Sequence, residues 1–382
     1  MIGKTKVSVT RVGEIFSSIE RAINLAGGIS LEGKETVLIK PNAVFGLKPS
    51  TGIVTNPEII DGVIKYLLSK GIEPQKISLG DCSAMGYDTS KAFRFSGMTD
   101  VCKTHGVKIV EFFKKGCIRK DISLKGTKLC IDIAREVFEA DVLIGVPVIK
   151  THFQSEVSMS LKNMFGTASW DSRKELHKMG LTDGIAYLNT LLPKYFTVGD
   201  ATIGLQGNGP ALLGKPGNWG LIFASTNPVA HDAMVCQLFG LDIPKHVKKA
   251  GELGLGMADT EKIELVGESR SSIRRKIERP GKDITPLKNV DIVDGDACSY
   301  CMNNLWTVLL KLSKEDLKSD KKIQVLIGNI IKECDINLHK QKVICGNCAI
   351  KYRHLSNNVI PGCPPETKKI ILTLREILNK RL

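Results

Sequence analysis

Short apolar runs alternate with amphipathic segments along most of the chain, and this alternation predicts strands followed by helices. Residues 142–149 form an apolar, β-branched run bounded by turn residues, which is typical of a strand buried on both faces of a parallel sheet. Residues 58–70 carry apolar side chains along one side only, as an amphipathic helix does. A second apolar run follows at 76–80, so this stretch predicts a βαβ unit with a right-handed crossover.

The same pattern predicts the other elements. Strands are expected at residues 6–12, 35–40, 107–112, 195–198, 220–224 and 263–266, and helices at 13–25, 93–105, 184–192, 244–253 and from 227 onward. Residues 118–133 are expected to form a hairpin, and the segment GLQGNGP at 204–210 a glycine-rich loop near a ligand. The predicted fold class is therefore α/β, with a Rossmann-like, mostly parallel sheet flanked by helices.

Length and composition predict two domains. A chain of 382 residues with 42% hydrophobic residues can bury a large core and exceeds the usual size of a single domain. We expect an α/β core at 1–269, a charged linker at 270–290, and a small cysteine-rich α+β domain at 291–382. No apolar run is long enough to span a membrane, and the amino terminus lacks the apolar core of a signal peptide, so a cytoplasmic location is expected.

The net charge of +14 raises the question of acidic partners. Residues 298–382 hold 15 Lys and Arg against 7 Asp and Glu, so much of the charge lies in the cysteine-rich part. The basic residues are dispersed and aromatic residues make up only 5% of the chain, which disfavours a nucleic-acid groove. A surface for an acidic redox partner protein is the better prediction.

Polar side chains follow several of the predicted strands. Lys40, Asp81, Lys150 and Asp200 each stand at or just past the carboxyl end of an apolar strand. Ligands of open α/β sheets bind in the crevice outside these ends, so the four groups could converge on one site. We expect them to bind an anionic small molecule, a cofactor or a second metal, with further contributions from neighbouring polar residues, namely Asn42, Asn163 and Asp232. For Asp232, stabilisation of a helix amino terminus is an equal alternative.

Two side chains in the same region could carry chemistry. His152 follows the strand that delivers Lys150, and a lone KTH tripeptide could also simply open a solvated loop. Lys162 lies within the apolar segment SLKNMFG, where an amine must reach solvent, find a partner or lose its proton.

Six of the eleven cysteines crowd into the last 85 residues. Cys298 and Cys301 form one CxxC pair, Cys345 and Cys348 a second, and Cys363 lies in Gly-Cys-Pro-Pro before the last predicted helix. Two CxxC pairs also suit a zinc ribbon, and a purely structural thiol cluster is a third alternative. Cysteines that lead into helices favour an iron–sulfur cluster, because helix amino termini stabilise thiolates.

The GCPP segment resembles the cysteine–proline segment near the terminal cluster of the respiratory complex I small subunit. We therefore expect a 4Fe-4S cluster on Cys298, Cys301, Cys348 and Cys363, with Cys345 as the main substitute ligand.

Several segments together resemble the domain-of-unknown-function family 362 of iron-sulfur proteins. They are IKPN, TNPEII, VPVIKTH, SLKNMFG, VGDA, GNGP and NPVAHDA, and the tail with CSYC, GNCA and PGCPP is similar to a cluster module of some members. The resemblance implies an α/β core and a 4Fe-4S cluster, without a reaction. Together with the residues above, it leads us to expect an iron–sulfur oxidoreductase whose tail cluster transfers electrons. The first alternative is an electron-transfer or cluster-carrier protein without core catalysis.

A more distant similarity is to the nickel-pincer lactate racemases. The order His152, Lys162, His177 matches the residue types of their active site, in which imidazoles act with a lysine. This similarity implies catalytic roles for the three residues. It supplies the second alternative, a racemase or epimerase-like enzyme with a structural cluster.

Overall fold

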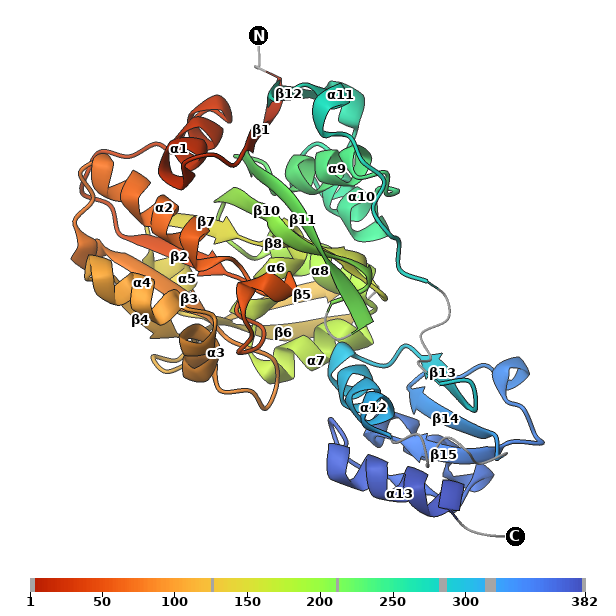
Figure 1. Ribbon diagram of the computed structural model, residues 1–382. Helices are drawn as coiled ribbons and strands as arrows, with labels where there is room; N and C mark the ends of the chain where they lie inside the picture. The colour runs from red at the N-terminus through yellow and green to blue at the C-terminus, as the bar shows by residue number, and fades with distance from the viewer. Residues whose placement is uncertain (1–3, 125–126, 211–212, 282–286, 313–320, 380–382) are drawn as a thin grey trace. The chain divides into compact units, whose positions relative to one another are not determined.

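The computed structural model describes residues 4–124, 127–210, 213–281, 287–312 and 321–379 (Figure 1). The chain divides into two compact units, one of residues 1–210 with 214–280 and the other chiefly of residues 281–382. Each unit has its own sheet. None of the helices in the described ranges has the length and apolarity needed to cross a bilayer.

The large unit is built on a 10-stranded, mostly parallel sheet. Its main path is β12 (Ile263–Gly267), β1 (Thr5–Arg11), β11 (Leu213–Ser225), β10 (Tyr195–Asn208), β7 (Val142–Val146), β2 (Val37–Pro41), β3 (Ile77–Asp81) and β4 (Lys108–Glu111). The pairings from β10 to β4 are parallel, whereas β1 and β11 are antiparallel. The predicted α/β class is therefore confirmed.

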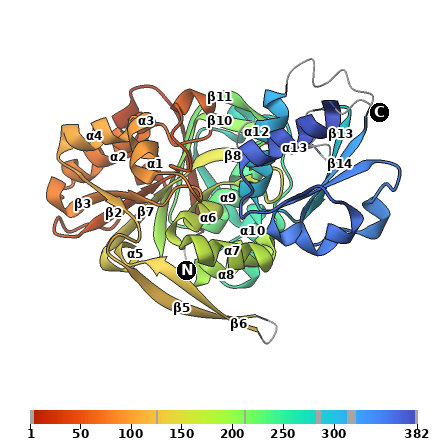
Figure 2. The same ribbon diagram turned by 90° about the horizontal axis from the view of Figure 1, so that it is seen from below.

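Helices cover both faces of this sheet (Figures 1 and 2). One face packs against α1 (Ile15–Leu25), α2 (Pro57–Ser69), α3 (Thr89–Phe95) and α4 (Met98–His105). The other packs against the hairpin of β5 (Cys117–Leu124) and β6 (Thr127–Ala134), and against α5 (Glu136–Glu139), α6 (Ser160–Asn163), α7 (Trp170–Lys178), α8 (Leu181–Thr190), α9 (Pro228–Leu238) and α10 (Lys245–Glu252). Strand β2 shows the alternation: Leu38 enters one core, and Val37 and Ile39 the other.

The structure divides two of the predicted elements. The helix expected at 93–105 is two helices, α3 and α4, because Gly97 between them adopts a φ of 85°. The strand expected at 142–149 ends at Val146, and β8 (Val148–His152) begins after Pro147, which has no backbone N–H for the ladder. Strand β8 pairs with β10 and with the short β9 (Glu156–Ser158).

The prediction of a glycine-rich loop at 204–210 is wrong for most of its length. Strand β10 continues to Asn208, and Leu205 pairs with Lys150 of β8. The glycines here serve close packing: a Cβ on Gly204 would collide with the indole of Trp219 and the carbonyl oxygen of Ile149. The segment therefore supports the strand that delivers Lys150 and His152.

Residues 270–280 pack on the large unit. They include α11 (Arg270–Ile273), and Ile273 and Ile277 are buried in its core. The backbone N–H groups of Arg275 and Ile277 donate to the carbonyl oxygens of Leu238 and Phe239 over 2.9 and 3.1 Å.

The small unit contains a four-stranded sheet in the order β13 (Val290–Gly295), β14 (Ile323–Gly328), β15 (Gln341–Cys345) and β16 (Val359–Ile360). The three pairings between these strands are parallel, so the sheet differs from the expected α+β arrangement. Parallel strands need crossovers, and α12 (Ser299–Lys311) and the 3₁₀ segment η7 (Asn347–Leu355) lie in two of them. Helix α13 (Thr367–Asn379) follows β16.

Candidate functional site

The buried ion pair of Lys40 and Asp81 joins the ends of neighbouring strands. The Lys40 Nζ atom lies 2.8 Å from Asp81 Oδ1, and the two residues are 1% and 3% exposed. Lys40 Nζ also donates to Pro41 O over 2.9 Å and to Asn163 Oδ1 over 3.4 Å. An ammonium has three donors, so Lys40 has none left for a ligand. The ion pair therefore has a structural role, and the Lys40 amine is not available to bind a ligand.

A glycine allows the chain to close over this ion pair. A Cβ on Gly166 would collide with the Asp81 carboxylate and the Lys40 amine. Because glycine has no Cβ, the SLKNMFG segment can lie directly against the pair. The Asn163 side chain adds a second connection by donating to the Lys40 carbonyl oxygen over 3.2 Å.

Arg173 on α7 connects the end of this segment to the chain just after β3. Its guanidinium donates to four carbonyl oxygens, those of Ala168, Ser83, Cys82 and Gly166, over 2.8 to 3.0 Å. The residue is 3% exposed. Nothing in the sequence distinguishes Arg173, because the segment DSRKELHK is polar apart from Leu176 and gives no sign of which polar side chain is buried.

Lys150 and Lys162 have hydrogen-bonding capacity to spare. Lys150 Nζ donates to Ile53 O over 2.7 Å and to Asn42 Oδ1 over 3.3 Å, which leaves one donor. The Lys162 ammonium lies 5.3 Å from the centre of the Phe165 ring, and no hydrogen bond joins it to a side chain or carbonyl in the described ranges. Burial lowers the pKa of Lys150 to about 7, helped by the charge of Lys162, and burial lowers that of Lys162 to about 8.

The two predicted catalytic histidines have opposite tautomers. His152 Nδ1 accepts from the N–H groups of Gln154 and Ser155 over 3.1 and 3.4 Å, which places its proton on Nε2. His177 Nδ1 lies 2.6 Å from the carbonyl oxygen of Arg173, and a carbonyl can only accept, so this ring carries its proton on Nδ1. Burial lowers the pKa of His177 to about 4 and that of His152 well below its usual value. Both rings are neutral at pH 7.

These basic groups lie close enough to influence one another. After burial, the charge of Lys162 is the next cause that lowers the pKa of Lys150, His152 and His177, and that of Arg173 lowers the pKa of Lys162. We call Lys150, His152, Lys162, Arg173 and His177 the basic cluster. The structure thus brings the three predicted catalytic residues together with Lys150. Lysine and arginine side chains at 40, 150, 162 and 173 outnumber the two carboxylates bonded to the same region, Asp81 and Asp232, so an anion would neutralise the excess charge.

Asp232 positions the turn that carries Lys162. Its Oδ1 accepts from the N–H of Ser160 over 2.9 Å and its Oδ2 from that of Leu161 over 3.0 Å, so it caps the first turn of α6. His231 Nδ1 lies 2.8 Å from the same carboxylate. The alternative for Asp232 was stabilisation of the amino terminus of its own helix, α9, but the contacts are to the first turn of α6, and α9 is capped by Asn227.

Asp200 has polar contacts away from the basic cluster. Its Oδ2 accepts from the N–H of Asn56 over 2.7 Å, and its Oδ1 from the N–H and the hydroxyl of Thr202 over 3.0 and 2.6 Å. Burial raises its pKa to about 6. Among the described contacts none joins Asp200 to Lys150 or Lys162, and its role in ligand binding stays a prediction.

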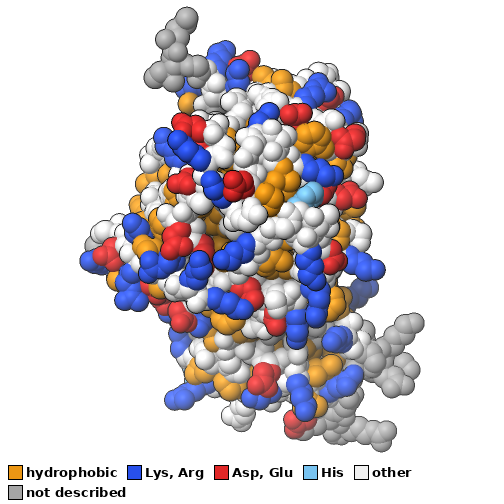
Figure 3. Space-filling model, turned by 90° about the vertical axis from the view of Figure 1, so that its left-hand side faces the viewer, with side chains coloured by type: hydrophobic (Ala, Val, Ile, Leu, Met, Phe, Trp, Pro, Cys, Tyr) orange, Lys and Arg blue, Asp and Glu red, His pale blue; other side chains and the backbone are white. Residues whose placement is uncertain are grey.

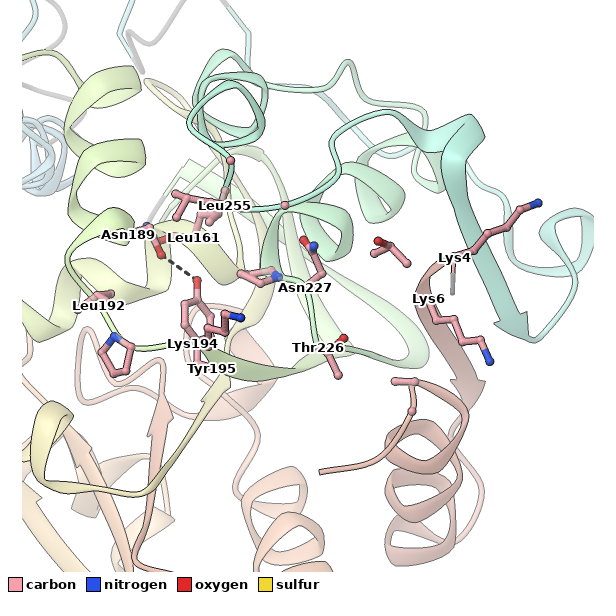
Figure 4. Close-up of a pocket in the computed structure, with 17 residues that line it drawn as sticks. Lys4, Lys6, Leu161, Asn189, Leu192, Lys194, Tyr195, Thr226, Asn227 and Leu255 are labelled. Carbon is pink, nitrogen blue, oxygen red and sulfur yellow. Dashed lines mark hydrogen bonds between the residues drawn. The ribbon is translucent and has the colours of Figure 1, made fainter. Parts of the chain in front are cut away.

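Two cavities lie on the large unit. One of about 630 Å³ opens beyond the ends of β3 and β4 and is lined in part by Cys82, Glu111 and Trp170, so it adjoins the Lys40–Asp81 pair. The other, of about 530 Å³, lies at the start of β1 and β10 (Figure 4). None of the predicted site residues lines it, and Figure 4 shows the amino groups of Lys4 and Lys6 pointing away from Tyr195.

Surface charge does not mark a further site on the face drawn in Figure 3. Lys and Arg side chains are interspersed there with Asp and Glu. Charges of both signs in close proximity do not produce a strong field of one sign.

The predicted cysteine ligands occupy loop and helix ends of the small unit. Cys298 precedes α12 and Cys301 lies in its first turn, while Cys345 ends β15. The loop after Cys345 is bonded to the loop before Cys363: Asn347 N–H donates to Gly362 O over 2.9 Å, and Gly362 N–H to Asn347 Oδ1 over 2.7 Å.

The donor type suits a thiolate-bound centre, because all four predicted ligands are cysteines. A hydrogen bond to Cys298 and burial raise the pKa of the Cys301 thiol, and the charges of Cys298, Cys345 and Cys363 add to this rise. Within the described ranges, no three Cys, His, Asp or Glu side chains are already arranged around one point to hold a metal ion. The ligand set of Cys298, Cys301, Cys348 and Cys363 stays a prediction.

Fold and site together define an α/β protein with a buried, cation-rich site near the carboxyl ends of parallel strands. The chain belongs to the family described as Domain of unknown function (DUF362), whose pattern matches residues 37–237. The resemblance found in the sequence is thereby confirmed for the family. The family brings no reaction with it.

Three known proteins are similar to this chain. A thylakoid-associated protein of Synechocystis sp. is 26% identical over 258 residues, which cover 65% of this chain and 77% of that protein. The lactate racemase apoprotein of Thermoanaerobacterium thermosaccharolyticum has 14% identity and a TM-score of 0.40, covering 84% of this chain and 68% of its own. A Thermotoga maritima protein has 12% identity and a TM-score of 0.42, covering 96% and 82%.

Proposed function

We propose that this protein is an iron–sulfur oxidoreductase whose large unit binds an anionic small molecule at the basic cluster. One observation carries the anion-binding part of the proposal: the buried Lys150 and the partly buried Lys162 retain hydrogen-bond donors in a region where positive charge exceeds negative charge. Buried charges without partners are costly, so such a region is suited to a ligand of opposite charge. Carboxylates and phosphates are the anions that lysine commonly binds.

The residues of the cluster have distinct roles in this proposal. Lys150 and Lys162 neutralise the anion, and Asp232 holds the turn that presents Lys162. His152 donates the proton on its Nε2, and His177 accepts a proton on its Nε2. Arg173 connects the end of the SLKNMFG segment to the chain after β3 by hydrogen bonds to four carbonyl oxygens.

The tail cysteines would hold the cluster. Cys298, Cys301, Cys348 and Cys363 are the proposed ligands of a 4Fe-4S cluster, with Cys345 as substitute. When bound, such a cluster supplies or accepts single electrons. The basic residues of this part of the chain suit an acidic redox partner protein as the external donor or acceptor.

Anaerobic purification followed by iron, sulfide, zinc and nickel analysis tests the cofactor, with paramagnetic resonance of the dithionite-reduced protein. Iron and sulfide in the proportions of a 4Fe-4S cluster, lost in Cys363→Ser, would support the proposal. Zinc alone would make the tail structural and overturn the redox role. If Lys162→Met leaves every measurable function of the iron-loaded protein intact while Cys363→Ser abolishes it, the chain is an electron or cluster carrier.

A second candidate is a racemase or epimerase-like proton transfer in which the cluster is structural. The opposite tautomers of His152 and His177 favour it, because one ring can donate while the other accepts. It predicts deuterium incorporation into an anionic substrate in deuterated water without an external electron donor. Incorporation that depends on a donor would reject this candidate.

A further inference from the structure

His246 is a buried imidazole that the roles above do not use. It lies in the first turn of α10 and is 2% exposed. Its Nε2 atom has no hydrogen-bond partner within the part of the chain that the structure describes. Buried polar atoms are nearly always paired, so an unpaired one calls for a partner from outside the fold.

His231 provides a useful contrast. Its Nε2 atom is also buried and lacks a partner within the described ranges. The backbone of Gly199 packs directly against this ring, since a Cβ on Gly199 would collide with His231 Nε2. His231 also has a structural partner in Asp232. An orphan nitrogen that is packed in this way has no room for a ligand.

Helix α10 packs against α8 and α9, and both of these helices also pack against α6, which carries Lys162. In the β8–β9 pair, His152 stands opposite Glu156. Burial raises the pKa of Glu156, and the charges of Lys245 and Lys248 on α10 oppose that rise, so these lysines lie near the hairpin. His246 stands between them in the sequence and is buried.

His246 is also within electrostatic reach of the basic cluster. Burial lowers its pKa to about 4, the Asp232 charge opposes this and the Lys162 charge adds to it. His246 is in turn one of the groups that lower the pKa of His152, after burial and the charges of Lys162, Lys150 and His177. At pH 7 the ring is neutral, so it offers a hydrogen bond without adding charge.

We propose that His246 is a third imidazole of the core site, where it hydrogen-bonds a second oxygen function of the anion held by Lys150 and Lys162. The inference rests on the proposed anion site and narrows its ligand class. A neutral imidazole adds little attraction for a bare charge, but it discriminates between ligands with and without a polar group at its position. The ligand is therefore a small anion with a further carboxylate, carbonyl or hydroxyl oxygen.

Calorimetric titration of the full chain with oxalate and acetate tests this assignment. Oxalate carries a second carboxylate and acetate a methyl group in its place. We expect the wild type to prefer oxalate, and His246→Leu to reduce the ratio of the two affinities about tenfold, as loss of one buried hydrogen bond does. His246→Gln, which keeps a donor and an acceptor, restores part of the ratio. His105→Gln, altering a histidine paired with Asp61 over 2.6 Å on the other face of the sheet, leaves it unchanged.

A spectroscopic measurement keeps the test independent of how the leucine variant folds. In protein labelled with ¹⁵N-histidine, oxalate should shift the His246 ring resonances, identified by their loss in His246→Gln. An unchanged affinity ratio in His246→Leu, or no shift with oxalate, overturns the role of His246. If Lys162→Met abolishes binding in that case, the anion site itself stands. If the wild type binds neither probe, both proposals fall.

Discussion

Lys40 lies against the SLKNMFG segment and Lys162 belongs to it, and the two lysines differ in the number of hydrogen bonds that their amines make. Lys40 Nζ has three acceptors, among them the Asp81 carboxylate at 2.8 Å. Lys162 has an aromatic ring and no hydrogen bond to the described residues. Removing one partner of the buried pair would leave the other charge without compensation, whereas Lys162 is partly exposed and pairs with no carboxylate among the described residues. We therefore expect Lys40 to have a structural role and Lys162 to bind the ligand.

Removing the charge of Asp81 should have the largest effect on stability. Asp81→Asn leaves the Lys40 ammonium buried without its counter-charge, and we expect the free energy of unfolding to fall by about 3–5 kcal/mol. Urea unfolding followed by circular dichroism measures it. The control is Asp171→Asn, because this carboxylate is 91% exposed although it pairs with Lys174 at 2.9 Å. Equal losses of unfolding free energy in the two variants would contradict a structural role for the buried ion pair.

A methyl group added at Gly166 should have the next largest effect on stability. Gly166→Ala places a methyl group against the Asp81 carboxylate and the Lys40 amine, and overpacking of this kind costs about 1–3 kcal/mol. Gly13→Ala is the matched control, since a Cβ there meets nothing within 4 Å. The same unfolding titration compares them. A stable Gly166→Ala protein would show that the segment can move away from the ion pair.

The pH dependence of stability should report on Lys150. Its pKa is about 7 in the folded protein against an ordinary value of 10.5, so the unfolded chain binds more protons between these values. The free energy of unfolding should therefore rise with pH from about 7 upward, by at most about 1.4 kcal/mol per pH unit. Lys150→Met lacks this contribution. Unfolding curves of both proteins at pH 7, 8 and 9 measure the difference, and parallel pH profiles would contradict the prediction.

The sequence was sufficient for the residues at strand ends. Lys40, Asp81 and Lys150 follow apolar strands, and the ends of neighbouring parallel strands lie together by geometry. The hairpin of β5 and β6 was also predictable, because local patterns determine it. Asn163 was found because it interrupts an apolar run.

The residues contributed by polar-looking helices could not be predicted. Arg173 and His246 lie in segments rich in lysine, where nothing local distinguishes a buried side chain from an exposed one. Their burial depends on which helix packs against which strand, which is a tertiary property. The loop predicted from the glycines at 204–209 was wrong for a related reason. They permit close approach of one backbone to another, and the sequence alone cannot distinguish this from a flexible loop.

Substitution of Lys162 should have the smallest effect on stability, and it tests most directly whether Lys40 and Lys162 have different roles. Lys162→Met removes an amine without a described hydrogen bond and keeps the apolar stem, so the free energy of unfolding should change by less than about 1 kcal/mol or increase. Lys40→Met, the matched variant, strands Asp81 and should lose several times more. Urea unfolding measures stability, and calorimetry with oxalate measures binding, which should disappear in Lys162→Met and be retained by any Lys40→Met protein that remains folded. A loss of stability in Lys162→Met as large as in Lys40→Met would show that Lys162 also has a structural role, and the proposed difference between the two lysines would be wrong.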